Sequence, residues 1–197
     1  VGLDTLIHVA NGVYENCPND EMRGNFELPD FINKMSENKW LGDKTKQGFY
    51  KKSKDANGKR VIEALNLNTM EYAPKKRAKF GTIAAAKQED NFLKRLKILV
   101  KGKDKAGEFY RKSFYSSFAY VSHRIPEITD ELYKIDRALC AGFGWKIGPF
   151  QMWDALDVEK TLSKMEEAGY RAADWVYDMV KAGNTSFYTT KNDTLNY

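Results

Sequence analysis

Apolar residues recur at helical spacing along most of the chain, which predicts a mainly α-helical protein. In residues 3–15 apolar positions three and four apart line one face. A second helix is expected from Leu28-Pro29 onwards, since proline suits a first turn, and another over about 84–100. The C-terminal part carries five more apolar stripes: Phe114, Phe118, Val121 and Ile125; Ile128, Leu132, Ile135, Leu139 and Phe143; Phe150, Trp153 and Leu156; Leu162 and Met165; Trp175, Val176 and Met179.

The helical parts are separated by a glycine-rich loop, a hairpin and a basic stretch. Asn57-Gly58 lies between two short extended runs, so residues 49–65 are predicted to form a small β-hairpin. Residues 66–82, which contain Pro74, are interpreted as a connector. We therefore expect three segments, which are a first helical region with the hairpin over 1–65, a basic connector and helix over 66–110, and a second helical region over 111–197.

A weak internal repeat relates the two helical regions. Leu3-Asp4-Thr5 matches Leu156-Asp157-Val158, residues 30–35 align without gaps to residues 174–179, and Phe49-Tyr50 matches Phe187-Tyr188. The matches keep their order, which chance would not favour. Two copies are too few for a solenoid, so we predict a duplicated helical subdomain whose first copy lacks its beginning.

Composition indicates a globular protein and excludes a chain disordered throughout. Of the 197 residues, 42% are hydrophobic and 30% charged, and no apolar run approaches the length of a membrane span. Residue 1 is Val and no signal peptide follows it, so we read the chain as cut from something longer. Cys17 and Cys140 occupy unrelated contexts, which predicts reduced thiols in a cytoplasmic protein.

The positive charge is concentrated in the middle of the chain. Residues 39–105 carry 19 Lys and Arg against 7 Asp and Glu, although the net charge of the whole is +5. Such a stretch can serve an anionic partner. Few aromatic residues alternate with the lysines, which favours a solvated linker over a nucleic-acid site. A basic helical nucleic-acid-binding module and an interaction scaffold remain the alternatives.

No self-sufficient active site is visible in the sequence. Gly142–Gly148 superficially resembles a dinucleotide-binding motif, but the segment before it has helical periodicity, and a helix C-cap with a tight turn explains the glycines. Asp4 and His8 lie one helical turn apart, a spacing that suits an acid–base pair. An ordinary side-chain contact between two residues of one helix is the simpler interpretation. A structural role is also the simpler reading for His123. We expect no metal site.

Two stretches nevertheless resemble the C-terminal helical domain of 3-hydroxyacyl-CoA dehydrogenases. Val1–Thr5 followed by Leu41–Tyr50 looks like that family's "VGLDT" helix and "G-x-K-T-G-x-G-F-Y" loop. In the second copy Ile135–Ala138, Gly142-Phe143-Gly144, Gly148-Pro149-Phe150 and Asp154 resemble its "iD-x-a … G-x-G … GPF … D" signature. The resemblance implies a duplicated 6-phosphogluconate-dehydrogenase-C-terminal-like fold, as in multifunctional fatty-acid β-oxidation proteins.

The resemblance also implies what the chain lacks. The family's NAD-binding Rossmann domain and catalytic His–Glu pair would precede residue 1, so we expect no catalytic residue, no cofactor-binding residue and no turnover from this chain alone. Lys46 stands where the family usually has Gly. His123-Arg124 occupies the place of the family's catalytic Asn-Arg, and no catalytic role is transferred to it. Val1, Gly2, Leu3 and Thr5 are the predicted substrate-proximal residues. Acyl-CoA through the missing domain and self-association or pseudo-dimer packing are the expected partners, without nucleic acid.

Overall fold

The structure, a computed structural model, describes residues 2–191 and 194–196. The chain divides into two compact units, Val1–Ala78 and Lys79–Tyr197. The first contains α1 (Leu3–Asn16), the 3-10 helix η1 (Arg23–Phe26), α2 (Asp30–Glu37), the 3-10 helix η2 (Asp43–Thr45), β1 (Tyr50–Lys54), β2 (Arg60–Leu65) and β3 (Tyr72–Pro74). The second contains α3 (Gly81–Lys87), α4 (Phe92–Lys101), α5 (Lys105–His123), α6 (Leu132–Phe143), α7 (Pro149–Leu156), α8 (Val158–Glu167), α9 (Asp174–Lys181), β4 (Thr189–Lys191) and β5 (Thr194–Asn196).

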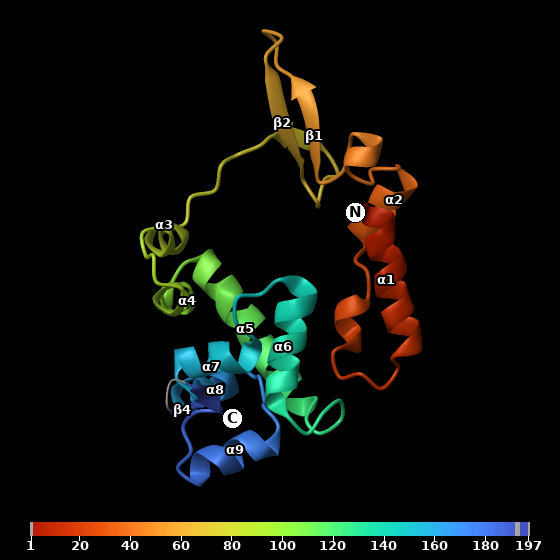
Figure 1. The fold of residues 1–197 in the computed structure, drawn as a ribbon. Helices are drawn as coiled ribbons and strands as arrows, with labels where there is room; N and C mark the ends of the chain where they lie inside the picture. The colour runs from red at the N-terminus through yellow and green to blue at the C-terminus, as the bar shows by residue number, and fades with distance from the viewer. Residues whose placement is uncertain (1, 192–193, 197) are drawn as a thin grey trace. The chain divides into compact units, whose positions relative to one another are not determined.

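The predicted mainly α class is confirmed, with one small antiparallel sheet in the first unit (Figure 1). The predicted hairpin is present as β1 and β2, joined by a turn in which Gly58 has φ 76°. The sheet has a third strand, β3, within the segment predicted as a connector. Among the described residues, no helix combines the length and apolarity needed to cross a bilayer.

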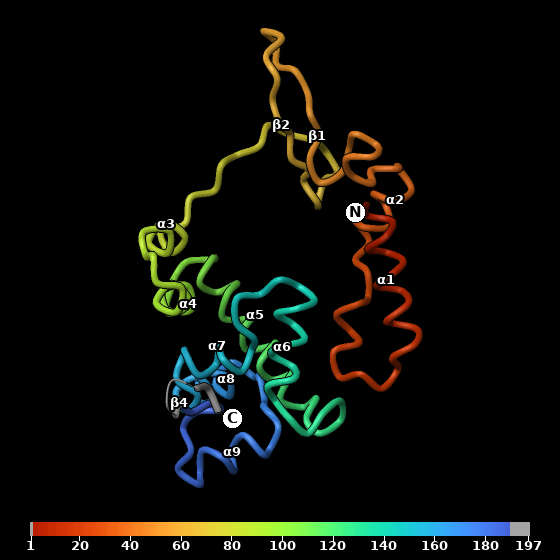
Figure 2. Tube along the Cα trace, viewed as in Figure 1, coloured from red at the N-terminus to blue at the C-terminus, as the bar shows by residue number. Residues whose placement is uncertain are grey.

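The predicted connector over 66–110 contributes to both units. Its beginning supplies β3, an extended stretch follows (Figure 2), and its remainder supplies α3, α4 and the start of α5. The single helix predicted over 84–100 is wrong, because the chain leaves the helix after α3 and starts again at α4. Asn91 explains the restart, since its side chain accepts a 3.0 Å hydrogen bond from the Lys94 amide as an N-cap.

The first unit has a small core. Its buried cluster consists of Leu3, Ile32, Met35 and Leu65, with partly buried Trp40 and Tyr72 packed edge to face at 5.3 Å between ring centroids. The apolar stripe predicted on α1 is only partly buried. Leu6 is 51% and Val9 is 53% exposed.

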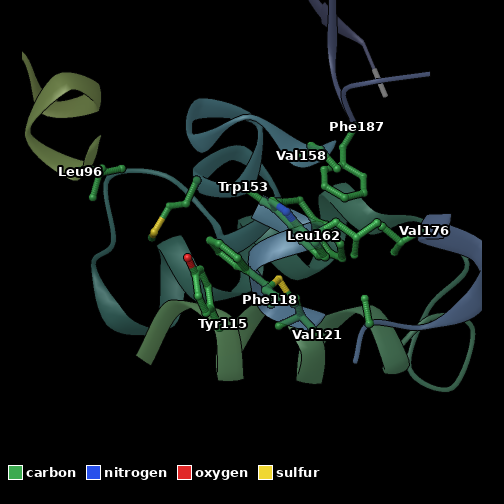
Figure 3. Packing of buried hydrophobic residues seen from close by; sticks show 13 residues of the cluster. Leu96, Tyr115, Phe118, Val121, Trp153, Val158, Leu162, Val176 and Phe187 are labelled. Carbon is green, nitrogen blue, oxygen red and sulfur yellow. The ribbon is translucent and has the colours of Figure 1, made fainter. Parts of the chain in front are cut away.

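The second unit has a much larger, aromatic core (Figure 3). Phe118 of α5 stacks on Trp153 of α7 with centroids 5.1 Å apart, and Phe187 meets Trp153 at 5.2 Å. Val158 and Met165 of α8 are fully buried beside them. One predicted stripe is wrong at its ends, because Ile128 precedes α6 and Phe143 ends it, and both are more than two-thirds exposed.

One pair of the aligned repeat segments shares local structure. Both α2 and α9 have eight residues and begin at the aligned aspartates, Asp30 and Asp174. Each ends with a residue of positive φ, 58° at Lys39 and 87° at Gly183, and each closes with the same backbone hydrogen-bond pattern. This agreement supports a repeat over about eleven residues; duplication of a whole subdomain stays a prediction.

The difference in core size predicts a difference in local stability. Thirteen buried residues form the cluster of the second unit and four form that of the first, and burial of apolar side chains is what resists local opening. Amide hydrogen exchange should therefore be faster over residues 3–40 than over 114–156. Slower exchange over residues 3–40 in a monomeric sample would contradict this expectation.

Candidate functional site

The two motif stretches of the first unit lie against each other. The Leu3 amide at the start of α1 donates a 3.0 Å hydrogen bond to the Leu41 carbonyl, and the Asp4 carboxylate pairs with the Lys44 ammonium. This hydrogen-bonded pair lowers the pKa of Asp4. A Cβ on Gly2 would collide with the Asp4 and Lys44 side chains. The "VGLDT" and "G-x-K-T" elements thus form one assembly.

The loop needs its glycines for two different reasons. Gly42 has φ 110°, a conformation that side chains rarely adopt. A Cβ on Gly48 would lie 2.9 Å from the Gly42 Cα, so the two backbone segments approach too closely for any side chain. The Thr45 hydroxyl accepts a 3.0 Å hydrogen bond from the Leu41 amide, and the Tyr72 hydroxyl of β3 donates to the Gly48 carbonyl.

A small apolar pocket of about 260 Å³ opens between α1 and this loop. We call it the apolar pocket. Its wall contains two of the predicted substrate-proximal residues, Gly2 and Leu3, whereas Thr5 is exposed and outside the wall, and Val1 lies outside the described residues. No titratable side chain lines it, so it can hold an apolar group but cannot move a proton. The lining is Gly2, Leu3, Leu6, Met35, Trp40, Leu41, Gly42, Gly48 and Phe49.

Sequence reasoning missed most of this wall. The motif includes Leu41 and Phe49 without assigning them to a pocket, and it does not include Trp40, although Leu41 precedes Gly42 and Phe49 follows Gly48. Apolar residues that flank backbone-constrained glycines are a usable signal, because the constrained turn fixes the direction in which its neighbours point.

In the second unit the signature residues meet around one buried carboxylate. Asp136 of α6 is 3% exposed and accepts hydrogen bonds from the amides of Phe150 at 2.9 Å and Gln151 at 3.0 Å, at the N-terminus of α7. The Tyr188 hydroxyl donates a third bond at 3.0 Å. A Cβ on Gly148 would lie 2.2–2.3 Å from atoms of Asp136. The "D … GPF" pattern therefore describes a helix cap supplied by a neighbouring helix.

Asp154 of α7 also accepts two backbone amides, but from the stretch that follows α9 rather than from a helix start. Its carboxylate accepts the amides of Phe187 at 2.8 Å and Tyr188 at 3.0 Å, which holds this C-terminal stretch against α7. Burial raises the pKa of Asp154 to about 6, to which the nearby Asp136 adds. Burial likewise raises the pKa of Asp136 and of Tyr188. These oxygens are occupied by donors within the fold, so the cluster positions elements rather than a substrate.

The other predicted candidates behave as structural residues. Gly144 has φ 67° and ends α6 as a left-handed C-cap, as predicted, and a helix rather than a strand precedes it, so these residues do not fit a dinucleotide. Asp4 pairs with Lys44 and not with His8. The His123 ring lies 3.3 Å from the Arg171 carbonyl. In the described part of the chain no three His, Cys, Asp or Glu residues gather as metal ligands.

Comparison with known proteins confirms the resemblance. The chain is 37% identical over all of its 197 residues to a Bacillus subtilis protein named "Probable 3-hydroxyacyl-CoA dehydrogenase". It is also 26% and 24% identical, over 153 residues, to proteins of Rickettsia felis and Rickettsia prowazekii named "Putative fatty acid oxidation complex trifunctional enzyme". No protein-family model matches the chain, and no solved structure matches it significantly.

The chain is thus a relative of dehydrogenases and multifunctional enzymes of fatty acid oxidation. It spans 24% of the length of the Bacillus relative and 20% of each Rickettsia relative. The names of these relatives agree with the resemblance to 3-hydroxyacyl-CoA dehydrogenases that the motifs indicate.

The close approach at Gly148 predicts a strong effect of one methyl group. Gly148→Ala should lower the free energy of unfolding by about 3 kcal/mol or more, because the new Cβ meets backbone as well as side-chain atoms of Asp136. Gly142→Ala is the control, since its Cβ would meet nothing within 4 Å in α6, and a gain of up to about 1 kcal/mol is expected. Urea unfolding measures both, and equal midpoints would refute the close packing.

The raised pKa of Asp154 predicts a pH-dependent stability. The carboxyl proton of Asp154 is held more tightly in the folded state. The contribution of this group to the stability of the fold is therefore complete below about pH 4 and is lost as the pH rises through about 6. The stability difference between the native protein and Asp154→Asn should therefore shrink between pH 4 and 6. Thermal unfolding across that range measures it.

Asp104 supplies a control of opposite sign. Its carboxylate accepts the amides of Gly107 and Thr82 at 3.0 Å, and the pKa is lowered to about 2. For Asp104→Asn the difference in the free energy of unfolding from the native protein should instead grow as the pH rises to about 4 and stay constant from pH 4 to 6. Parallel curves for the two variants would contradict the assignment.

Proposed function

We propose that the chain is the C-terminal substrate wall and pseudo-dimerisation region of an NAD-dependent 3-hydroxyacyl-CoA dehydrogenase of fatty-acid β-oxidation. The observation that carries this proposal is the joining of the "VGLDT" and "G-x-K-T" stretches around the apolar pocket. The match of all 197 residues to part of a relative that is about four times longer supports it.

In this proposal the chain supplies binding surface and no reacting group. The apolar pocket offers burial to the acyl or pantetheine part of the substrate, at about 25 cal/mol for each Å² of apolar surface removed from water. Hydride transfer to NAD and proton abstraction belong to residues of the longer protein, which would complete the reaction of 3-hydroxyacyl-CoA to 3-oxoacyl-CoA. We therefore expect the chain alone to be inactive.

The half-exposed face of α1 is the proposed packing surface. Leu6 is 51% and Val9 53% exposed, and leaving such side chains in water forgoes roughly 1.5–3 kcal/mol each relative to full burial. A second helical copy or another part of the same protein would cover this face. Pseudo-dimer packing would bury these apolar residues, which as a contiguous exposed surface would otherwise promote association.

A domain exchange tests the function. The matching segment of the Bacillus subtilis relative is replaced by this chain, and NADH formation with 3-hydroxybutyryl-CoA and NAD is measured for the exchange, for the relative with the segment deleted and for the chain alone. Activity is expected only for the exchange. NADH formation by the chain alone, or full activity of the deletion, would refute the proposed role.

Two matched substitutions in the active exchange protein separate substrate contact from packing. Leu6 lines the apolar pocket and Val9 does not, although both are half exposed on the same helix. Leu6→Ser should raise the KM for the acyl-CoA several-fold with a smaller change in kcat, and Val9→Ser should leave KM unchanged. Identical effects on KM would show that the pocket does not contact the substrate.

A further inference from the structure

A second and larger pocket of the first unit is lined by lysines. It has a volume of about 630 Å³, which lies within the range of small-molecule sites. Loop 42–47 and the three-stranded sheet form its walls. Its positive groups are Lys46, Lys51, Lys52 and Lys75, and Tyr50 and Ile62 supply aromatic and aliphatic surface. We call it the lysine pocket.

The sheet register gathers two of the lysines, Lys52 and Lys75, on one face, whereas Lys51 pairs with Glu63 on the opposite face and lies over the Tyr72 ring. Lys52 of β1 faces Ile62 of β2 across the strand pair, and the Lys75 amide donates a 3.0 Å hydrogen bond to the Ile62 carbonyl from the other side. Tyr50 lies two residues before Lys52 and shares its face. The Lys75 ammonium sits 4.6 Å from the Tyr50 ring centroid.

The charges of the lysine pocket are not balanced within it. Asp43 is the one acidic side chain in its lining, against four lysines. Within the part of the chain that the structure describes, none of these four lysines is recorded in a salt bridge. Like charges held together repel one another, so an anion between them would be bound favourably.

The backbone at Lys46 points to the same conclusion. Lys46 has φ 60°, in the left-handed region that favours glycine. A lysine there strains the backbone, and its side chain lines the lysine pocket. Strained residues persist where the surrounding structure or a function requires them.

Gly42 lines both the lysine pocket and the apolar pocket. A ligand that spans them would have an apolar or neutral end and a polyanionic end. We propose that the lysine pocket binds the 3′-phosphorylated adenosine diphosphate end of coenzyme A, with its phosphates among Lys46, Lys52 and Lys75 and its adenine against Tyr50. This assignment deepens the proposed function and rests on it for the identity of the ligand.

Calorimetric titration of the 197-residue chain tests the proposal. Coenzyme A and adenosine 3′,5′-bisphosphate should bind, and pantetheine, which lacks the phosphates, should bind at least tenfold more weakly. Lys52→Gln and Lys75→Gln should each weaken coenzyme A binding about tenfold. Lys59→Gln is the control, since this lysine lies in the same hairpin outside the lysine pocket.

Lys46→Gly is the sharpest variant because its two effects have opposite signs. Glycine relieves the left-handed strain, so the melting temperature should stay equal or rise, whereas coenzyme A affinity should fall several-fold. A variant with unchanged affinity would overturn the proposal, and the preserved fold excludes unfolding as an explanation of a loss.

Other ligands define the remaining outcomes. Inorganic phosphate, duplex DNA or phosphatidylglycerol vesicles binding as tightly as coenzyme A, with the same dependence on the lysines, would replace a coenzyme A site by a general anion surface and overturn the proposal. An inactive domain exchange with lysine-dependent coenzyme A binding would reject the dehydrogenase role and leave the lysine pocket assigned. An active domain exchange in which coenzyme A binding does not depend on Lys46 would support the dehydrogenase role and reject the assignment of the lysine pocket.

Discussion

The second unit depends on one buried carboxylate at the N-terminus of a neighbouring helix. The amides at the start of α7 have no partners within their own helix, and Asp136 of α6 accepts two of them. This contact requires the backbones to approach so closely that residue 148 must be glycine. With α7 fixed in this way, Trp153 is held against Phe118 and the core closes around it. Asp154 of the same helix then holds the stretch that contains Phe187.

The features of this network that follow from local sequence are predictable, and those that depend on contacts between helices are not. Periodicity predicted most of the helices, and the left-handed cap at Gly144 followed from its glycine and the turn after it. The hydrogen bond that the Phe150 amide donates to Asp136 could not be predicted from spacing, because it joins two helices that are separate in sequence. The family motif identifies the residues of this signature, but it does not show the contact that links them.

The same limit applies in the first unit. Asn57-Gly58 predicted the hairpin from local turn preference. Strand β3 could not be predicted in this way, because it forms by pairing with β2. The charge count marked residues 39–105 as basic and the scarcity of aromatics favoured a linker, yet register decides which lysines share a face. Lys52 and Lys75 are 23 positions apart in sequence and flank the same isoleucine. The apolar pocket likewise joins residues 2–6 to residues 40–49, a pairing that only the fold reveals.

The small core of the first unit and its two pockets are physically connected. A ligand that binds only the folded unit stabilises it by RT ln(1 + [L]/Kd), which is about 2.7 kcal/mol at a concentration of one hundred times Kd. For a unit whose buried cluster is Leu3, Ile32, Met35 and Leu65, such a contribution is a large part of the total. Leu3 belongs to this cluster and also lines the apolar pocket, so the residues that bind would be the residues that hold the unit together. In the proposed function a substitution of Leu3 would therefore weaken folding and binding together, so the start of α1 would tolerate fewer apolar side chains than packing alone accepts.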